Sequence, residues 1–285
     1  PISASGPPGT ALTLNAANDI NINQPITSGS NALNLALNHG TSGSNKAVLG
    51  ASLGANVNVG TYNSAGSVSS GAGKLQVDSG SHTLAGSLVA NQLEVSGGSL
   101  TLDNGTTATL VSGSISSGGS LTLKGATING SGTLTNQGTL ATFNNVTNNI
   151  NMSLGNATGA MLRVSDQSVA NPGGIALTIA NGFTNSGTIE LVTNAGNCCG
   201  PSSATLNVTT GTLTNATGAT IRSTGLSATT NTLNAQVTNQ GTIEVNQPLA
   251  VTNASRTFTS SAGTLNVASA QTLTINIDGA TSPGI

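Results

Sequence analysis

The carboxylates are the first residues whose chemistry has to be considered. Eight Asp and Glu residues are present: Asp19, Asp78, Glu94, Asp103, Asp166, Glu190, Glu244 and Asp278. A glycosidase needs two carboxyl groups at a defined separation. Glu190 and Glu244 follow equivalent Gly-Thr-Ile sequences, but two or more turns of a stacked fold would hold them more than about 9 Å apart. We therefore expect exposed, solubilising charges rather than a catalytic pair.

The other residues that could do chemistry have unfavourable contexts. His39 and His82 stand in turn-like contexts, so we expect solvated corner histidines and no metal site. Asp103-Asn104-Gly105 is read as a turn rather than a calcium loop. No Gly-x-Ser-x-Gly lies between a strand and a helix. The sequence therefore predicts no enzyme and no cofactor.

The adjacent cysteines Cys198 and Cys199 lie in the turn-rich segment from Asn197 to Pro201. They can form a vicinal disulfide, stay as thiols or pair with another chain. In an oxidising, secreted setting we expect a vicinal bridge that stiffens a surface loop. There is no Cys-x-x-Cys, so we expect no redox role.

Composition excludes further classes of function. The 285 residues include only 6 Lys and Arg, 1% aromatics and no Trp. So few cations and stacking rings argue against a nucleic-acid partner. No apolar run approaches the ~18 residues that a membrane-spanning helix needs, so we expect no membrane insertion.

The elements that must position these residues are short strands. Apolar-polar-apolar triplets recur along the chain, for example Leu75-Gln76-Val77, Leu100-Thr101-Leu102, Leu121-Thr122-Leu123 and Leu265-Asn266-Val267. Alternation of period 2 predicts strands, and Gly, Asn and Ser clusters between them predict turns. We predict an all-β chain folded as a single parallel β-solenoid with irregular corner loops. Leu100, Leu102, Leu121, Leu123, Leu265 and Val267 are expected to share its narrow core.

A longer repeat supports stacked turns. Leu134-Thr135-Asn136-Gln137-Gly138-Thr139 resembles the segments that begin at Phe183, Leu213 and Val237. We expect the Thr-Asn spacing of 24 to be one turn and the spacing of 49 about two, with typical turns of ~20–25 residues. We read residues 1–285 as one continuous rod; the alternative is two domains with a boundary near Asn197–Ser203.

Threonines that flank inward leucines should point outward. The pairs are Thr133 and Thr135, Thr212 and Thr214, and Thr272 and Thr274. Threonine is a good strand former, which is the simplest explanation. Ladders of outward Thr can also order ice, so an ice-binding solenoid is kept as a less favoured alternative.

Several segments resemble the filamentous-haemagglutinin-like exoproteins of Gram-negative bacteria. The opening stretch Gly9-Thr10-Ala11-Leu12-Thr13-Leu14-Asn15-Ala16-Ala17-Asn18-Asp19-Ile20-Asn21-Ile22 and the segment Gly132–Thr139 carry the likeness. The resemblance implies a right-handed β-helix, two-partner or autotransporter-like secretion, and adhesion or biofilm work. The family's secretion domain contains Asn-Pro-Asn-Gly-Ile, whereas this chain has Asn171-Pro172-Gly173-Gly174-Ile175. The chain therefore resembles a passenger segment.

Together these features predict an extracellular or cell-surface adhesin or matrix scaffold. Its partners would be glycans, other cell-surface molecules or copies of itself. The alternative is a structural fibre subunit that stacks head to tail, because neither end of the sequence looks capped. A carbohydrate-active β-helix enzyme is a third and less favoured class.

Overall fold

The computed structural model describes residues 2–4, 10–24, 26–28, 33–39, 46–49, 57–64, 74–78, 80–143, 146–165, 174–193, 201–226, 229–253 and 256–277. These residues form strands, bends and turns, with no helix among them. The chain divides into two compact units, Pro1–Leu134 and Thr135–Ile285, which we describe separately.

The first unit contains the strands β1 to β12 and most of β13. They are β1 (Ile2–Ala4), β2 (Ala11–Asn15), β3 (Ile20–Ile22), β4 (Ile26–Ser28), β5 (Leu33–His39), β6 (Lys46–Leu49), β7 (Val57–Ser64), β8 (Lys74–Val77), β9 (Ser81–Val95), β10 (Gly98–Leu102), β11 (Thr107–Ile115), β12 (Gly119–Leu123) and β13 (Thr127–Asn136).

The second unit contains the remaining strands. They are β14 (Thr139–Thr142), β15 (Thr147–Asn156), β16 (Met161–Ser165), β17 (Ile175–Asn185), β18 (Thr188–Thr193), β19 (Ala204–Asn215), β20 (Thr220–Gly225), β21 (Asn231–Asn239), β22 (Thr242–Val245), β23 (Leu249–Asn253), β24 (Phe258–Thr259), β25 (Thr264–Val267) and β26 (Leu273–Ile277).

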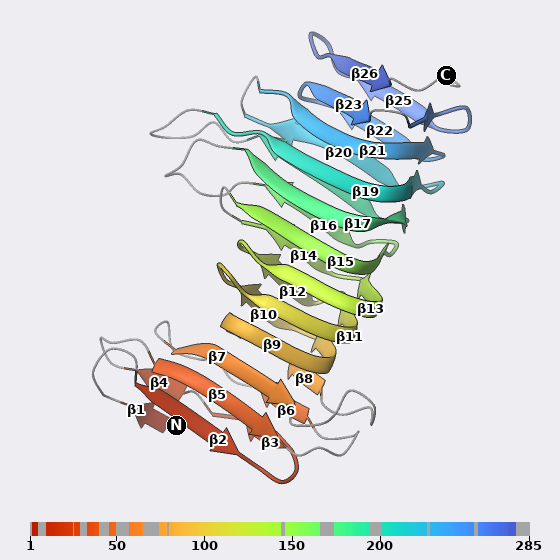
Figure 1. The fold of residues 1–285 in the computed structure, drawn as a ribbon. Helices are drawn as coiled ribbons and strands as arrows, with labels where there is room; N and C mark the ends of the chain where they lie inside the picture. Colours follow the sequence, from red (N-terminus) through yellow and green to blue (C-terminus); the bar gives the residue numbers. More distant parts are fainter. Residues whose placement is uncertain are drawn as a thin grey trace. The chain divides into compact units, whose positions relative to one another are not determined.

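Each unit is built from parallel strands that stack turn upon turn (Figure 1). In the first unit Leu100 of β10 pairs with Leu121 of β12, and Leu102 pairs with Leu123. In the second unit β17 pairs with β19 and β19 with β21 in the same parallel sense. The fold is therefore an all-β parallel β-solenoid, as the triplets predicted.

Several strands are longer than the triplets suggested. β9 has 15 residues and β19 has 12, because the strand continues through a bend. Where β17 meets β19 the register shifts between Asn181 and Phe183. A Cβ on Gly182 would lie 2.4 Å from the backbone nitrogen of Thr212, so only glycine lets β17 and β19 approach each other at this bend.

In each unit the core is a column of aliphatic side chains on the inner face of the strands. Leu100, Leu102, Leu121 and Leu123 are at most 1% exposed, which confirms four of the six predicted core positions. The prediction is wrong for Val267, which is 46% exposed, and Leu265 is only half-buried. The reason is stacking: β25 pairs with β22, and no described strand covers its other edge.

A ladder of buried asparagines runs through the second unit. Asn136, Asn156, Asn185, Asn215 and Asn239 are at most 2% exposed. Each Nδ2 donates to Oδ1 of the next asparagine at 2.7–2.8 Å, and Asn239 donates to Ser260 Oγ at 2.9 Å. Each Nδ2 also donates to a backbone carbonyl oxygen, such as Thr220 O for Asn185. The ladder therefore joins successive turns from the inside.

This ladder explains the repeated Thr-Asn-x-Gly-Thr sequence. Successive asparagines are 20, 29, 30 and 24 residues apart, so the spacing of 24 is one turn and 49 is two, as predicted. Turns of 29 and 30 residues exceed the expected length. The backbone nitrogen of Gly187 donates to Asn185 Oδ1 at 3.3 Å, and a Cβ on this glycine would lie 2.3 Å from Ala157 O. The motif is thus a buried amide followed by a turn that admits only glycine.

Candidate functional site

The second unit carries a column of alternating charges on four neighbouring strands. Arg163 of β16 pairs with Glu190 of β18, Glu190 with Arg222 of β20, and Arg222 with Glu244 of β22. We call these four residues the charged column. In a chain with 5% charged residues, four that meet in register are a distinct feature.

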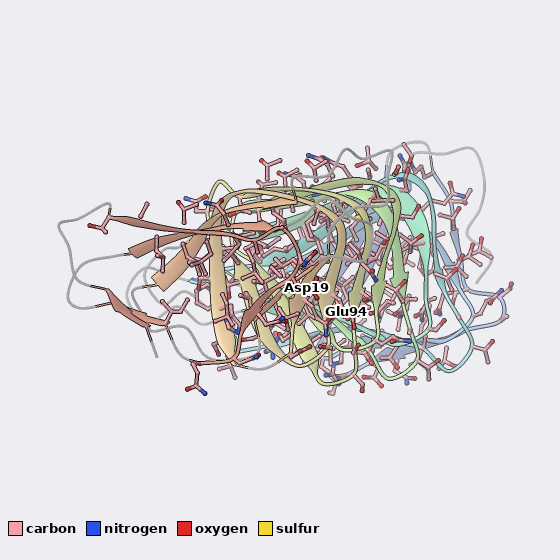
Figure 2. All side chains as sticks on the ribbon, turned by 90° about the horizontal axis from the view of Figure 1, so that it is seen from below. Asp19 and Glu94 are labelled. Carbon is pink, nitrogen blue, oxygen red and sulfur yellow. The ribbon has the colours of Figure 1, made fainter. Side chains whose placement is uncertain are left out.

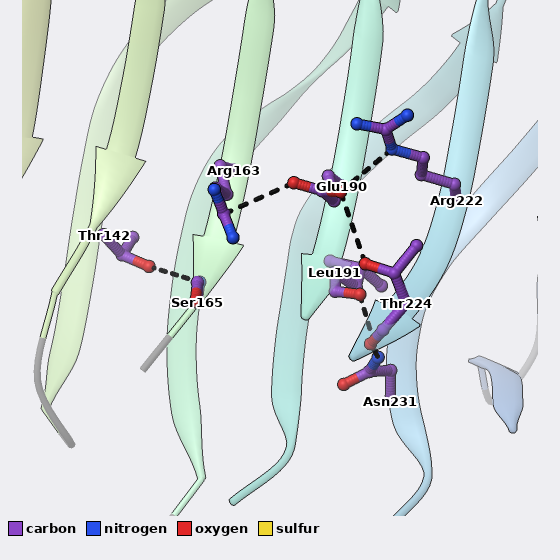
Figure 3. A network of polar contacts seen from close by, with 8 residues as sticks. All are labelled: Thr142, Arg163, Ser165, Glu190, Leu191, Arg222, Thr224 and Asn231. Carbon is purple, nitrogen blue, oxygen red and sulfur yellow. Dashed lines mark hydrogen bonds and ion pairs between the residues drawn. The ribbon is translucent and has the colours of Figure 1, made fainter. Parts of the chain in front are cut away.

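Glu190 lies at the centre of an ion-pair triad (Figure 3). Its Oε2 is 3.3 Å from Arg163 Nε, and its Oε1 is 3.0 Å from Arg222 Nε. The Glu190 side chain is 11% exposed, whereas those of Arg163 and Arg222 are 41% and 35% exposed. Thr224 Oγ1 donates a further hydrogen bond of 3.3 Å to Glu190 Oε1. The carboxylate is therefore compensated, and the two guanidinium groups reach solvent.

Buried polar groups fix the corner beside the triad. Asn231, fully buried, donates through Nδ2 to Leu191 O at 2.9 Å and to Ser223 Oγ at 3.0 Å. Its Oδ1 accepts from the backbone nitrogen of Ala204 at 2.8 Å. These contacts join β18, β19, β20 and β21, so they hold β18 and β20, which carry Glu190 and Arg222, in a defined register.

The expectation for the two glutamates is corrected in part. They do share one column two strands apart, as the equivalent sequences indicated. The prediction of an exposed, solubilising charge is wrong for Glu190, because its side chain lies between Arg163 and Arg222, forms ion pairs with both and is largely buried. Arg222 stands between the carboxylates, in the place that a sugar ring would occupy in a glycosidase.

A second surface of the same unit is uncharged and polar. We define the amide-hydroxyl face as two outward columns on β15, β17, β19, β21, β23 and β26, all half-buried or exposed. One column is Thr147, Ala176, Thr205, Thr232, Ala250 and Thr274; the other is Asn149, Thr178, Asn207, Asn234, Thr252 and Asn276. Asn234 Nδ2 donates to Asn207 Oδ1 at 3.1 Å, and Asn207 Nδ2 to Thr178 Oγ1 at 3.4 Å.

The threonine pairs predicted to point outward do so. Thr133, Thr272 and Thr274 are exposed, and Thr135, Thr212 and Thr214 are half-buried. Only Thr274 of these lies on the amide-hydroxyl face, where alanine interrupts the threonine column twice.

The described carboxylates of the first unit form no group of three that could hold a metal ion. Asp19, in the bend between β2 and β3, is exposed, and Glu94 in β9 is half-buried (Figure 2). Asp78 accepts hydrogen bonds from Gln76 and Ser96 at 2.6 and 2.5 Å. Asp166 and Asp278 lie outside the described residues.

Asp103 forms the turn that the sequence predicted. Asn104 and Gly105 follow it in a turn, with Gly105 at a φ of 79°. Its Oδ1 is 3.0 Å from Lys124 Nζ and accepts from the Asn104 nitrogen at 2.8 Å. Burial raises the pKa of Asp103, but the Lys124 and Asn104 hydrogen bonds and the Lys124 charge together lower that pKa below its usual value.

Both histidines lie in strands rather than in turns. His82 is 2% exposed and alternates inward with Leu84 in β9, opposite Leu100 of β10, so its prediction as a solvated corner residue is wrong. His39 is the last residue of β5 and pairs with Ser64, in a strand rather than a turn. Cys198 and Cys199 lie outside the described residues, so their vicinal bridge stays a prediction.

The part of the chain that the structure describes contains no group of three His, Cys, Asp or Glu residues able to hold a metal ion. It also contains no helix long and apolar enough to cross a membrane.

Sequence reasoning missed the two arginines of the charged column. The signal was present, because Leu162-Arg163-Val164 and Ile221-Arg222-Ser223 place the charge at the outward centre of a triplet, as Ile189-Glu190-Leu191 does. The triplets do not show the register between turns, and only this register brings the charged residues together.

Comparison of the chain with models of protein families, with curated proteins and with solved structures found no match.

Proposed function

We propose that this protein is a secreted bacterial adhesin or extracellular-matrix scaffold that acts through the outward faces of its β-solenoid. The resemblance to filamentous-haemagglutinin-like exoproteins favours the surface of a Gram-negative bacterium. The parallel solenoid is compatible with that resemblance and is a suitable frame for a repetitive surface.

The observation that carries this proposal is the amide-hydroxyl face. Its side chains repeat at the strand spacing of about 4.8 Å and present hydroxyl and amide groups with no charge. Each hydrogen bond to a sugar hydroxyl contributes only about 0.5–1.5 kcal/mol. A repeated array therefore binds a long glycan through many weak contacts, in the manner of a multivalent surface.

A glycan array with the purified chain tests this function. The double variant Asn207→Ala/Asn234→Ala removes two neighbouring amides of the face and should weaken binding about 10-fold, because two hydrogen bonds are lost. Thr220→Ala/Thr242→Ala, on the strands of the charged column, is the matched control and should bind like the parent.

Three results would overturn the proposal. Equal loss in both variants, or no binding to glycans and cell surfaces by the parent, would remove the role of this face. Release of reducing sugar ends from the bound glycans would place the protein in the carbohydrate-active class instead.

A further inference from the structure

The charged column has an order that is complementary to itself. Along β16, β18, β20 and β22 the signs are positive, negative, positive and negative. Consider a two-fold axis that runs parallel to the strands, in front of the face and midway between β18 and β20. A rotation of 180° about this axis reverses the order of the column and points the face of the second copy at that of the first. Two copies related by this axis place Arg163 opposite Glu244 of the second copy, and Glu190 opposite Arg222 of the second copy.

The charges at the two ends of the column are unequally compensated within one chain. Glu190 contacts both arginines through their Nε atoms, so the triad keeps a net positive charge, and the Arg163 side chain is 41% exposed. Glu244 forms no ion pair with any described residue, although Arg222 is its register neighbour. Arg163 and Glu244 are three strands apart, about 14 Å, too far to pair in the same chain.

The surface around the charges permits close approach. Beside the charged column runs an uncharged outward column of five threonines and one methionine: Thr139, Met161, Thr188, Thr220, Thr242 and Thr264. Under the same two-fold axis this column faces itself, so that Thr188 meets Thr220 and Met161 meets Thr242 of the second copy, with no charge in either contact.

We propose that this face binds a second copy of the chain, side by side, through the two-fold arrangement of the charged column. The opposite arrangement, with the columns in the same order, would set arginine against arginine and is disfavoured by like charge. The association deepens the proposed scaffold role, since it names a second copy as one partner, but it can be measured without any glycan.

The contact is expected to be weak. Six strands span about 24 Å, and a sheet face of that width with four residues a strand is smaller than the ~800 Å² a side of a standard stable interface. Its stability should therefore depend on the ion pairs and fall with salt, because partly exposed charges are screened.

Sedimentation equilibrium of the full chain, over a range of concentrations at low and high salt, tests this proposal. We expect a monomer–dimer equilibrium at about 0.02 M salt that shifts to monomer at about 0.5 M. Arg163→Glu and Glu244→Arg should each weaken association at least about 10-fold. The combined variant Arg163→Glu/Glu244→Arg should restore association to within about 3-fold of the parent, because the reversed charges again meet across the two-fold axis.

Lys124→Glu makes the same change of net charge as Arg163→Glu, but at a residue outside the charged column, and serves as its control. Circular dichroism establishes that each variant is folded, and Arg163→Gln replaces Arg163→Glu if the reversal unfolds the chain. A parent that stays monomeric at low salt, an association insensitive to salt, or a combined variant no better than the single ones would overturn the proposal. Glycan binding by a monomeric Arg163→Glu chain would leave the adhesive function standing and separate the two ideas.

Discussion

Asn185 is the residue at which the buried ladder is most open to test. Its Nδ2 donates to Asn215 Oδ1 at 2.8 Å and to the carbonyl oxygens of Thr220 and Gly187 at 3.2 Å each. Its Oδ1 accepts from Asn156 Nδ2 at 2.7 Å and from the Gly187 nitrogen at 3.3 Å. The residue is fully buried, so water does not replace these partners.

Asn185→Ala leaves several of these groups without a partner. Asn215 Oδ1 and the Gly187 N–H lose their bonds to the side chain, and Asn156 Nδ2 keeps only its bond to Thr188 O. A buried polar group left unsatisfied costs about 1–3 kcal/mol. We expect a loss of about 4 kcal/mol in the free energy of unfolding, a large share of the 5–15 kcal/mol of a typical domain.

Asn207→Ala is the matched control. Asn207 lies in β19 next to β17, as Asn215 does, but it points outward and makes side-chain contacts of only 3.1 and 3.4 Å. Its replacement should cost less than about 1 kcal/mol. Asn185→Asp keeps the shape of the side chain but replaces the donor Nδ2 by a carboxylate oxygen. This oxygen would face the acceptors Asn215 Oδ1 and Thr220 O, so the change should be at least as destabilising as Asn185→Ala.

Urea denaturation followed by circular dichroism measures the three changes. Because turns of a solenoid can unfold separately, hydrogen exchange should also show the loss of protection in β17 and β19 first. The reasoning is refuted if Asn185→Ala unfolds within about 1 kcal/mol of the parent, or if Asn207→Ala is equally damaging.

Three further predictions concern the core, one ion pair and the cysteines. Leu123→Asp buries an unpaired charge and should cost more than about 4 kcal/mol, whereas Val267→Asp, at a side chain 46% exposed, should change the urea midpoint little; similar midpoints would contradict the core assignment. The lowered pKa of Asp103 means that its ion pair stabilises the fold above a pH of about 3.9, and that this stabilisation is lost as the pH falls through the lowered pKa. Asp103→Asn should therefore cost less than about 1 kcal/mol at neutral pH, because the pair is partly exposed, and nothing in acid; a difference from the parent that grows in acid would contradict this reasoning. Intact mass after alkylation without reductant should show Cys198 and Cys199 unmodified, and two alkylated thiols would exclude the vicinal bridge.

Local pattern was sufficient to predict the secondary structure and much of the core. The alternation in Leu100-Thr101-Leu102 and Leu121-Thr122-Leu123 places both leucines of each triplet inward, since side chains on a strand alternate. The same alternation contained the buried ladder. Leu213 points inward and Thr214 outward, so Asn215 must point inward again, although its polarity argues for the surface.

Register between turns was decided only by the tertiary structure. Asn136, Asn156, Asn185 and Asn215 meet in one ladder despite turns of 20, 29 and 30 residues, because loops between the strands absorb the difference. Val267 is predicted to be buried by its triplet, yet it is exposed because no described strand stacks on β25. Arg163, Glu190 and Arg222 belong to separate triplets, and only the stacking of β16, β18 and β20 makes them one ion-pair network. Alternation is a property of a few neighbouring residues, whereas register and stacking depend on the length of every intervening loop and on what covers each turn.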